Sequence, residues 1–288
     1  PNYNAVFFDR LTANLGIRSE IFTALNKKVY FGPRLSLSYA LTELTNINFS
    51  TGIYLQSPSY IWLEAFESNK DLRMIQVNQF VFGFDQRISA DALLKVEAFY
   101  KDYNNYPTST VRPYLVLANT GAGFSGSDDN FSSFGLEPLV DAGFGKARCV
   151  ELSIQKKVSD IPYYGIFSFT YSQADYSSLD GIERSGSYDH NWLINLSGGY
   201  KFNEYWEVSS KFRFASGKPY TPFNSDGTQS IINYNTARMK SSHSLDVRAD
   251  KRWYFSGWTL ITYIDIQNIY NQKNNSGIRW DRRELKVA

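Results

Sequence analysis

Two histidines stand beside groups that support hydrolytic chemistry in other proteins. His190 follows Asp189, and His243 follows Ser242. Acids, hydroxyls and imidazoles of this kind form catalytic triads when they converge in space. Neighbours within a β-strand, however, point to opposite faces, so adjacency in the sequence does not create a triad. We therefore expect both histidines to be polar residues where loops meet strands, and we assign no catalytic residue and expect no enzyme.

A glycine-rich segment and three carboxylates are weaker signals for a bound ligand. Residues 121–126 read GAGFSG, the spacing of a dinucleotide fingerprint, but that fingerprint needs a strand before it and a helix after it. Here residues 127–130 follow with the sequence SDDN. Asp128, Asp129 and Asp141 offer oxygen ligands for calcium without the spacing of an EF-hand. We expect a solvated loop, with no cofactor and no metal.

Charges that share one side of a predicted strand are the strongest signal. Between residues 245 and 253, one parity is charged: Asp246, Arg248, Asp250 and Arg252. The other parity is apolar: Leu245, Val247, Ala249 and Trp253. Because a strand sends alternate side chains to opposite faces, one face is apolar and the other carries four charges. In a membrane barrel the apolar face contacts lipid and the charges line a wet interior.

The same alternation recurs along nearly the whole chain. It predicts eleven strands, near residues 9–20, 33–42, 46–56, 77–88, 94–101, 150–157, 167–172, 194–201 and 207–214, and on both sides of 256–257. These segments are close to the roughly 9–11 residues that a tilted strand needs to cross a bilayer. We expect mixed-sign ladders on a polar wall that faces the interior: Lys95, Glu151, Lys211, Arg213, Asp246, Arg248, Asp250 and Asp265.

Short and long connections alternate between these strands. The short ones lie near 42–45, 89–91, 159–162, 203–205 and 256–257, and the long ones cover about 57–76, 103–146, 173–190 and 217–241. Outer-membrane barrels have short periplasmic turns and long outer loops. The rhythm therefore favours such a barrel over the alternative, a soluble β-sandwich or propeller, which does not explain so many charges on a single face.

Composition narrows the class further. The mean hydropathy is −0.37, and no run approaches the roughly 18 apolar residues of a membrane helix, so a helical membrane protein is excluded. Aromatic residues make up 17% of the chain, as expected where rings mark two bilayer interfaces. The net charge of +2 is interspersed, so we expect no nucleic-acid partner. Cys149 is the single cysteine, so no intrachain disulfide exists.

Several segments resemble the C-terminal half of the barrel of a TonB-dependent outer-membrane transporter. They are PRLSLSY at 33–39, YLQSPSY at 54–60, SGKPYTP at 216–222 and the hairpin Leu245–Asn274. The resemblance covers essentially the whole chain, residues 1–288. It implies an all-β, transmembrane antiparallel β-barrel of 22 strands, of which these would be the eleventh to the twenty-first. It further implies a plug domain and a closing strand outside this sequence.

An open set of eleven strands also needs more strands on physical grounds. Unpaired backbone groups at its edges would face hydrocarbon, at several kcal/mol each. We expect the partners to be outer-membrane lipid, the rest of the barrel and its plug, and, by the resemblance, the TonB complex. A surface lipoprotein is a further candidate partner. The expected location is the bacterial outer membrane.

The resemblance implies an active transporter that imports a scarce large nutrient, such as a siderophore, a cobalamin-like cofactor or an oligosaccharide. A smaller outer-membrane hydrolase and a passive porin are the alternatives. Aromatic rings with polar tips suit such ligands, because they offer contact area at low entropic cost. We therefore expect the ligand to contact exposed loop aromatics: Tyr60, Trp62, Tyr103, Tyr106, Tyr220 and Trp280.

Overall fold

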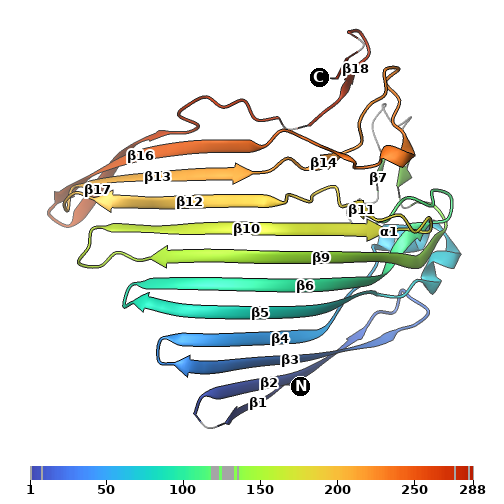
Figure 1. Cartoon of the computed structure of the whole chain (residues 1–288), viewed down its shortest axis with the longest axis horizontal. Helices are drawn as coiled ribbons and strands as arrows, with labels where there is room; N and C mark the ends of the chain where they lie inside the picture. Colours follow the sequence, from blue (N-terminus) through green and yellow to red (C-terminus); the bar gives the residue numbers. More distant parts are fainter. Residues whose placement is uncertain are drawn as a thin grey trace.

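One antiparallel sheet makes up most of the chain (Figure 1). The computed structural model describes residues 2–7, 9–117, 123–124, 133–134, 136–275, 277–284 and 286–287. Within them the main sheet runs in the order β1 (Asn2–Phe7), β2 (Leu11–Ile21), β3 (Val29–Thr42), β4 (Thr45–Gln56), β5 (Ile75–Ser89), β6 (Ala92–Ser109), β9 (Leu139–Lys156), β10 (Tyr163–Ser177), β12 (Trp192–Lys201), β13 (Trp206–Ala215), β16 (Ser242–Phe255) and β17 (Trp258–Ile266).

Short elements occupy the connections. They are α1 (Tyr60–Ala65), the 3₁₀ helices η1 (Glu67–Asp71) and η3 (Ile231–Asn233), β11 (Arg184–Ser185) beside β10, and the small pairs β7 (Gly123–Phe124) with β8 (Ser133–Phe134), β14 (Pro219–Tyr220) with β15 (Ala237–Arg238), and β18 (Trp280–Asp281) with β19 (Lys286–Val287). In the described part of the chain, no helix has the length and apolar character to cross a membrane.

All eleven expected strands are present, but two expectations about the sheet were wrong. The described sheet has a twelfth strand in its path, β1, whose six residues are too short to give a clear alternating pattern. In addition, β6 and β9 are 18 residues long each, so the connection expected at 103–146 covers only 110–138. Register shifts on both sides of Tyr106 interrupt the alternation of the two faces there. The alternating pattern in the sequence therefore does not show that β6 and β9 continue toward the loops.

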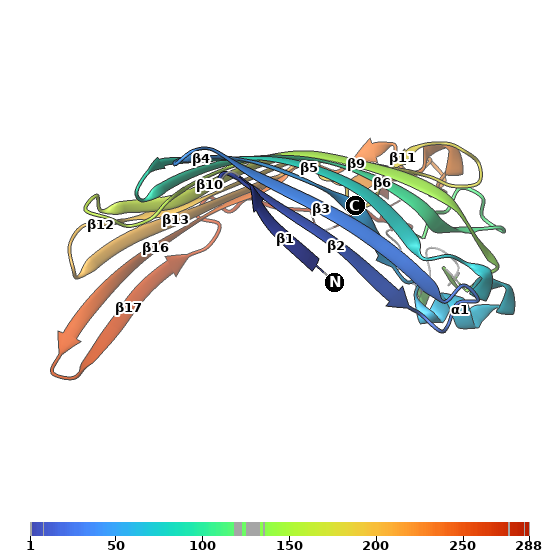
Figure 2. The same ribbon diagram turned by 90° about the horizontal axis from the view of Figure 1, so that it is seen from below.

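The connections segregate as the alternating rhythm predicts. Figure 1 shows the hairpin turns on the left and α1, β7, β11, β14 and β18 on the right. The short turns are 8–10, 43–44, 90–91, 157–162, 202–205 and 256–257, and the long connections are 22–28, 57–74, 110–138, 178–191 and 216–241. Figure 2 shows that the sheet curves into an arch. The fold is therefore a curved wall with turns at one end and loops at the other.

The register keeps the two faces of the wall distinct across neighbouring strands. Ser197, Lys211 and Asp246 lie directly opposite one another on β12, β13 and β16, and so do their apolar neighbours Leu196, Phe212 and Leu245 on the other side. We call these sides the polar face and the apolar face. Large hydrophobic side chains on the apolar face stay uncovered: Phe82 is 53% exposed. Exposed contiguous apolar area of this kind suits lipid and is costly in water.

A hydrophobic core forms at the loop end of the sheet, where long connections meet. We call it the loop core: Leu25, Tyr30, Trp62, Leu63, Leu72, Met74, Leu115, Leu117 and Leu139. Its members come from 22–28, from 57–74, from 110–117 and from the ends of β3 and β9. The connections on this side of the sheet are therefore packed against one another and against strand ends.

Candidate functional site

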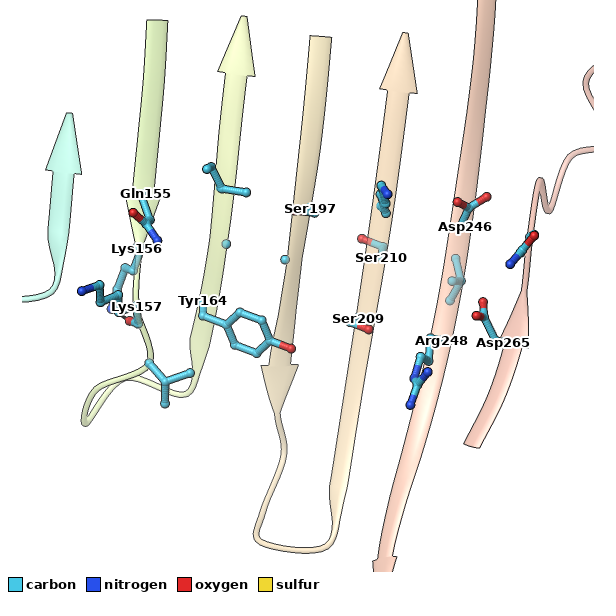
Figure 3. Close-up of a pocket in the computed structure, with 17 residues that line it drawn as sticks. Gln155, Lys156, Lys157, Tyr164, Ser197, Ser209, Ser210, Asp246, Arg248 and Asp265 are labelled. Atoms are coloured by element: carbon cyan, nitrogen blue, oxygen red, sulfur yellow. Dashed lines mark hydrogen bonds between the residues drawn. The ribbon is translucent and has the colours of Figure 1, made fainter. Parts of the chain in front are cut away.

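The polar face is hollowed over β9 to β17, and the expected charged wall lines this hollow (Figure 3). Its volume is about 700 Å³, and its lining includes Lys211, Asp246, Arg248 and Asp265. Figure 3 shows Tyr164 reaching across toward β12. Gly199 permits this approach, because a Cβ there would lie 2.6 Å from the Tyr164 hydroxyl. The Tyr164 hydroxyl donates to the Glu207 carboxylate on β13, which ties three strands together.

Ion pairs of opposite sign cross this part of the wall. Arg213 Nη2 lies 2.9 Å from Asp246 Oδ2, and Arg252 Nη2 lies 2.7 Å from Glu207 Oε2, both between β13 and β16. Arg248 pairs along its own strand with Asp250 at 2.7 Å, and its guanidinium stacks 3.8 Å from the Tyr263 ring centroid. The mixed-sign arrangement expected from the sequence is therefore present on the polar face.

A second hollow of about 420 Å³ lies on the polar face from β2 to β9, and two more of the expected wall residues, Lys95 and Glu151, line it. Lys95 Nζ lies 3.9 Å from Asp85 Oδ1. Glu151 lies directly opposite Glu97 across β6 and β9. Among the described residues, neither glutamate has a basic partner within ion-pair distance. Like charges directly opposite each other destabilise a strand pair, so a positively charged group beside Glu97 and Glu151 would be stabilising here.

Tyr103 and Tyr106, expected as exposed loop aromatics, lie instead in β6 within a packed cluster. Their ring centroids are 5.4 Å apart, and Tyr176 lies 6.0 and 5.4 Å from them. Tyr106 is buried. Gly145 makes room for the cluster, since a Cβ there would lie 2.5 Å from the Tyr176 ring. The expectation of exposure was wrong for Tyr106 because the strand continues past the point where alternation fails.

The other aromatic candidates lie in two further places. Tyr60 on α1 is 62% exposed, whereas Trp62, two positions along and so on the opposite side of the helix, is buried in the loop core. The expectation of an exposed Trp62 was therefore wrong, because α1 turns that ring inward. Tyr220 is half-buried in β14. Trp280 is half-buried in β18, where its ring lies 6.1 Å from Phe223 in the same connection as Tyr220.

The histidines hold loops in place. His190 Nδ1 lies 2.5 Å from the Ser216 carbonyl oxygen, and His243 Nδ1 lies 2.8 Å from the Tyr270 hydroxyl. Asp189, the expected acid beside His190, instead accepts a hydrogen bond from Arg238 at 2.6 Å. In the described part of the chain, neither histidine is joined to an acid and a serine hydroxyl in the manner of a triad.

Polar groups that the sequence did not single out join the long connections. Asn69 in η1 is fully buried and makes three hydrogen bonds: Nδ2 donates to the carbonyls of Trp62 (2.7 Å) and Glu137 (3.0 Å), and Oδ1 accepts from the Leu139 amide (2.8 Å). Asp189, with a side chain only 1% exposed, joins 178–191 to 216–241 through Arg238. Local sequence gives no signal for either role, because Glu137 and Leu139 lie far from Asn69 in the chain and Arg238 lies far from Asp189.

Ionisable groups in the loops respond to these contacts. A hydrogen bond from Arg184 holds the pKa of Asp180 below its usual value. Burial raises the pKa of Tyr234, whose ring lies 5.8 Å from Tyr114.

Of the carboxylates considered for calcium, Asp141 accepts a hydrogen bond from Arg73 Nε at 2.5 Å. The other two, Asp128 and Asp129, and most of 121–126 lie outside the described residues.

The model of the family "TonB dependent receptor-like, beta-barrel" matches residues 3–283. The chain belongs to this family. The resemblance stated from the sequence is thus confirmed, and the wall belongs to the barrel of a TonB-dependent receptor-like protein. No curated protein matches the chain in sequence.

Solved structures share the fold at low sequence identity. The outer membrane transporter YddB from Escherichia coli has a TM-score of 0.68 and 11% identity, over 94% of this chain and 41% of that one. The FrpB iron transporter from Neisseria meningitidis (F3-3 variant) has a TM-score of 0.65 and 13% identity, over 94% of this chain and 40% of that one. The ferripyoverdine receptor of the outer membrane of Pseudomonas aeruginosa has a TM-score of 0.66 and 13% identity, over 94% of this chain and 34% of that one. The chain therefore spans less than half of these proteins.

Proposed function

We propose that this chain is part of an outer-membrane active transporter that imports a scarce large nutrient, such as a siderophore, a cobalamin-like cofactor or an oligosaccharide, energised through the TonB complex. One observation carries the proposal: a TonB-dependent receptor wall with an uncovered apolar face and a charged, hollowed interior face. The structural neighbours named as an outer membrane transporter and an iron transporter support it. The work done is binding and release, with no bond broken.

The edges and hollows of the sheet indicate the partners. In the described residues β1 and β17 are the two edges of the sheet, and an open edge in lipid leaves backbone groups unsatisfied. We therefore propose that further strands of the same protein close the barrel and that a plug fills its interior. The facing carboxylates of Glu97 and Glu151 would receive a cationic side chain from that plug. Outer-membrane lipid would cover the apolar face, and a surface lipoprotein is a further candidate partner.

Dependence on energy coupling tests this function. In cells that carry the full-length protein, we expect growth on its limiting nutrient to stop when the TonB complex is deleted. Substituting His190 and His243 by Ala should leave uptake nearly intact, since no proton transfer is required. Uptake that continues without TonB would indicate a porin. Loss of a hydrolytic activity in the histidine variants, with TonB irrelevant, would indicate an enzyme.

The direction of the wall gives a separate prediction. If the long connections face the outside, protease added to intact cells should cleave within 110–138 and spare the turn at 256–257. Most of the expected cleavage region, 121–127, lies outside the described residues. The fragments are identified by mass spectrometry, and cells with a permeabilised outer membrane serve as the control. Cleavage at 256–257 in intact cells would invert the orientation.

A further inference from the structure

An arginine lies on the apolar face of β9. Arg148 shares its side of the strand with Val150 and Leu152, and the register places it directly opposite Tyr100 on β6 and Gln173 on β10. Arg148 is exposed, and within the described part of the chain no acid forms an ion pair with it. The plug proposed above would lie against the polar face, on the other side of the sheet. It therefore cannot supply a partner for this guanidinium.

The other cations of the apolar face do have partners. Three of them lie on this face among the described strands of the main sheet. Lys146 Nζ lies 2.9 Å from Glu183 Oε1, Lys156 is paired with Asp91, and the ammonium of Lys251 lies over three aromatic rings. A charge on a lipid-facing surface is costly unless it lies near the interface or is paired. The guanidinium on β9 thus calls for an anion from outside the described chain.

The row of Arg148 marks where this face changes from apolar to polar. The next row toward the loops is polar on four strands: Asn78, Asp102, Lys146 and Asp175. The next row toward the turns is apolar or aromatic: Phe82, Ala98, Val150 and Tyr171.

The distance along β9 agrees with this boundary. Arg148 and Lys156 lie on the same face, eight positions apart. Eight positions are roughly 27 Å along a strand, or about 20 Å in height at a tilt of about 40°. The apolar band of an outer-membrane barrel is about 25 Å tall. Arg148 therefore lies at the edge of the band that is nearer the loops, where lipid headgroups begin.

A groove of about 370 Å³ on the apolar face ends at this arginine. Ala98, the smallest side chain of its row, lies between Phe82 and Val150 and leaves room there. Tyr100 and Arg148 line the end of the groove toward the loops. Hydrocarbon can pack along such a groove, and a guanidinium fork at its end matches the oxygens of a phosphate. The groove and its cation together suit an amphiphile with a phosphorylated headgroup.

We infer that Arg148 binds a phosphate of lipid A in the outer leaflet, with an acyl chain in the groove over Ala98 and with Tyr100 beside the headgroup. Lipid A is a phosphorylated glycolipid with several acyl chains, and it faces the outside of the outer membrane. The inference rests on the proposed location of the wall and on the outward direction of its long connections. It goes beyond the proposed transport, because the nutrient takes no part in it.

Lipid binding to the full-length protein, purified with its plug and freed of lipid in detergent, tests the inference. The probes are lipid A, lipid A without its phosphates, and phosphatidylglycerol. EDTA is present, so that no divalent ion bridges a phosphate to Asp102 or Asp175. Native mass spectrometry measures the fraction of folded, heat-modifiable protein that carries one lipid. We expect intact lipid A to bind most tightly.

The variants test the contribution of the guanidinium. Arg148→Gln should weaken the binding of lipid A about tenfold, as expected for the loss of one charge-assisted contact, and Arg148→Lys should weaken it less. Lys251→Gln is the matched control, because it removes a cation from the same face near the turn at 256–257. This control should bind lipid A as the unchanged protein does.

The outcomes separate this inference from the proposed transport. Unchanged affinity in Arg148→Gln, equal binding of the lipid without phosphates, tighter binding of phosphatidylglycerol, or an equal loss in Lys251→Gln would each overturn the inference. TonB-dependent uptake would remain in all of these cases if the transporter assignment is right. A selective loss in the Arg148 variants would support the site even if uptake proved independent of TonB. Cleavage at 256–257 in intact cells would place Arg148 in the inner leaflet, and it too would overturn the inference.

Discussion

Phe82→Arg should prevent most of the full-length protein from assembling in the outer membrane. Phe82 lies on the apolar face, directly opposite Phe49 on β4 and Ala98 on β6, and it is 53% exposed. Phe82 lies near the middle of β5, away from both the turns and the loops, and lipid hydrocarbon is expected to cover this middle part of the wall. An arginine on the lipid face near the bilayer midplane costs about 2–4 kcal/mol. The measurement is the fraction of heat-modifiable, folded barrel in isolated outer membranes.

Ser168→Arg provides the matched control for that prediction. Ser168 lies on the polar face, opposite Ser153 on β9 and Asn195 on β12, so the added charge enters a polar interior and should be tolerated if the plug leaves room. Leu152→Arg should behave like Phe82→Arg, because Leu152 lies on the apolar face two strands from Phe82. Equal assembly of the two classes of variant would refute the division into a lipid face and an interior face.

The division into faces could be predicted from sequence because a strand has a period of two. Once Asp246, Arg248 and Asp250 shared one parity, their common face followed without knowledge of the fold. Their individual partners did not follow, since these depend on register and on side-chain reach. Lys211 lies directly opposite Asp246, yet it is Arg213, one polar-face position along β13, that forms the ion pair with Asp246.

The loop end was predictable only in outline. The alternating rhythm located the long connections, but the loop core depends on contacts between segments far apart in the chain. Trp62 was expected in solvent, and it is buried because α1 forms and packs against 22–28 and 110–117. Asn69 looks like an ordinary polar loop residue until Glu137 and Leu139 are brought to it across about 70 positions. No local pattern encodes such a contact.

Asn69→Ala should loosen the loop core more than any single change of an exposed loop residue. The substitution leaves the carbonyls of Trp62 and Glu137 and the amide of Leu139 without their partner in a buried position. Each unsatisfied buried group costs about 1–3 kcal/mol. Because the connections can open without unfolding the sheet, the loss should appear as local unfolding. Hydrogen exchange should therefore accelerate in 57–74 and at 136–139, while amides of β12 and β13 keep their protection.

Asn26→Ala is the comparison that gives this result its meaning. Asn26 belongs to the neighbouring connection 22–28, and its side chain makes one exposed hydrogen bond of 2.6 Å to Asp71. Water replaces an exposed partner at little cost, so exchange in this variant should change only slightly. If both variants accelerate exchange equally, burial at Asn69 is not what joins the connections, and the loop core is held by its apolar contacts alone. If only Asn69→Ala opens the connections, one buried amide, which bridges 57–74 to the start of β9, holds the loop end of the sheet in position.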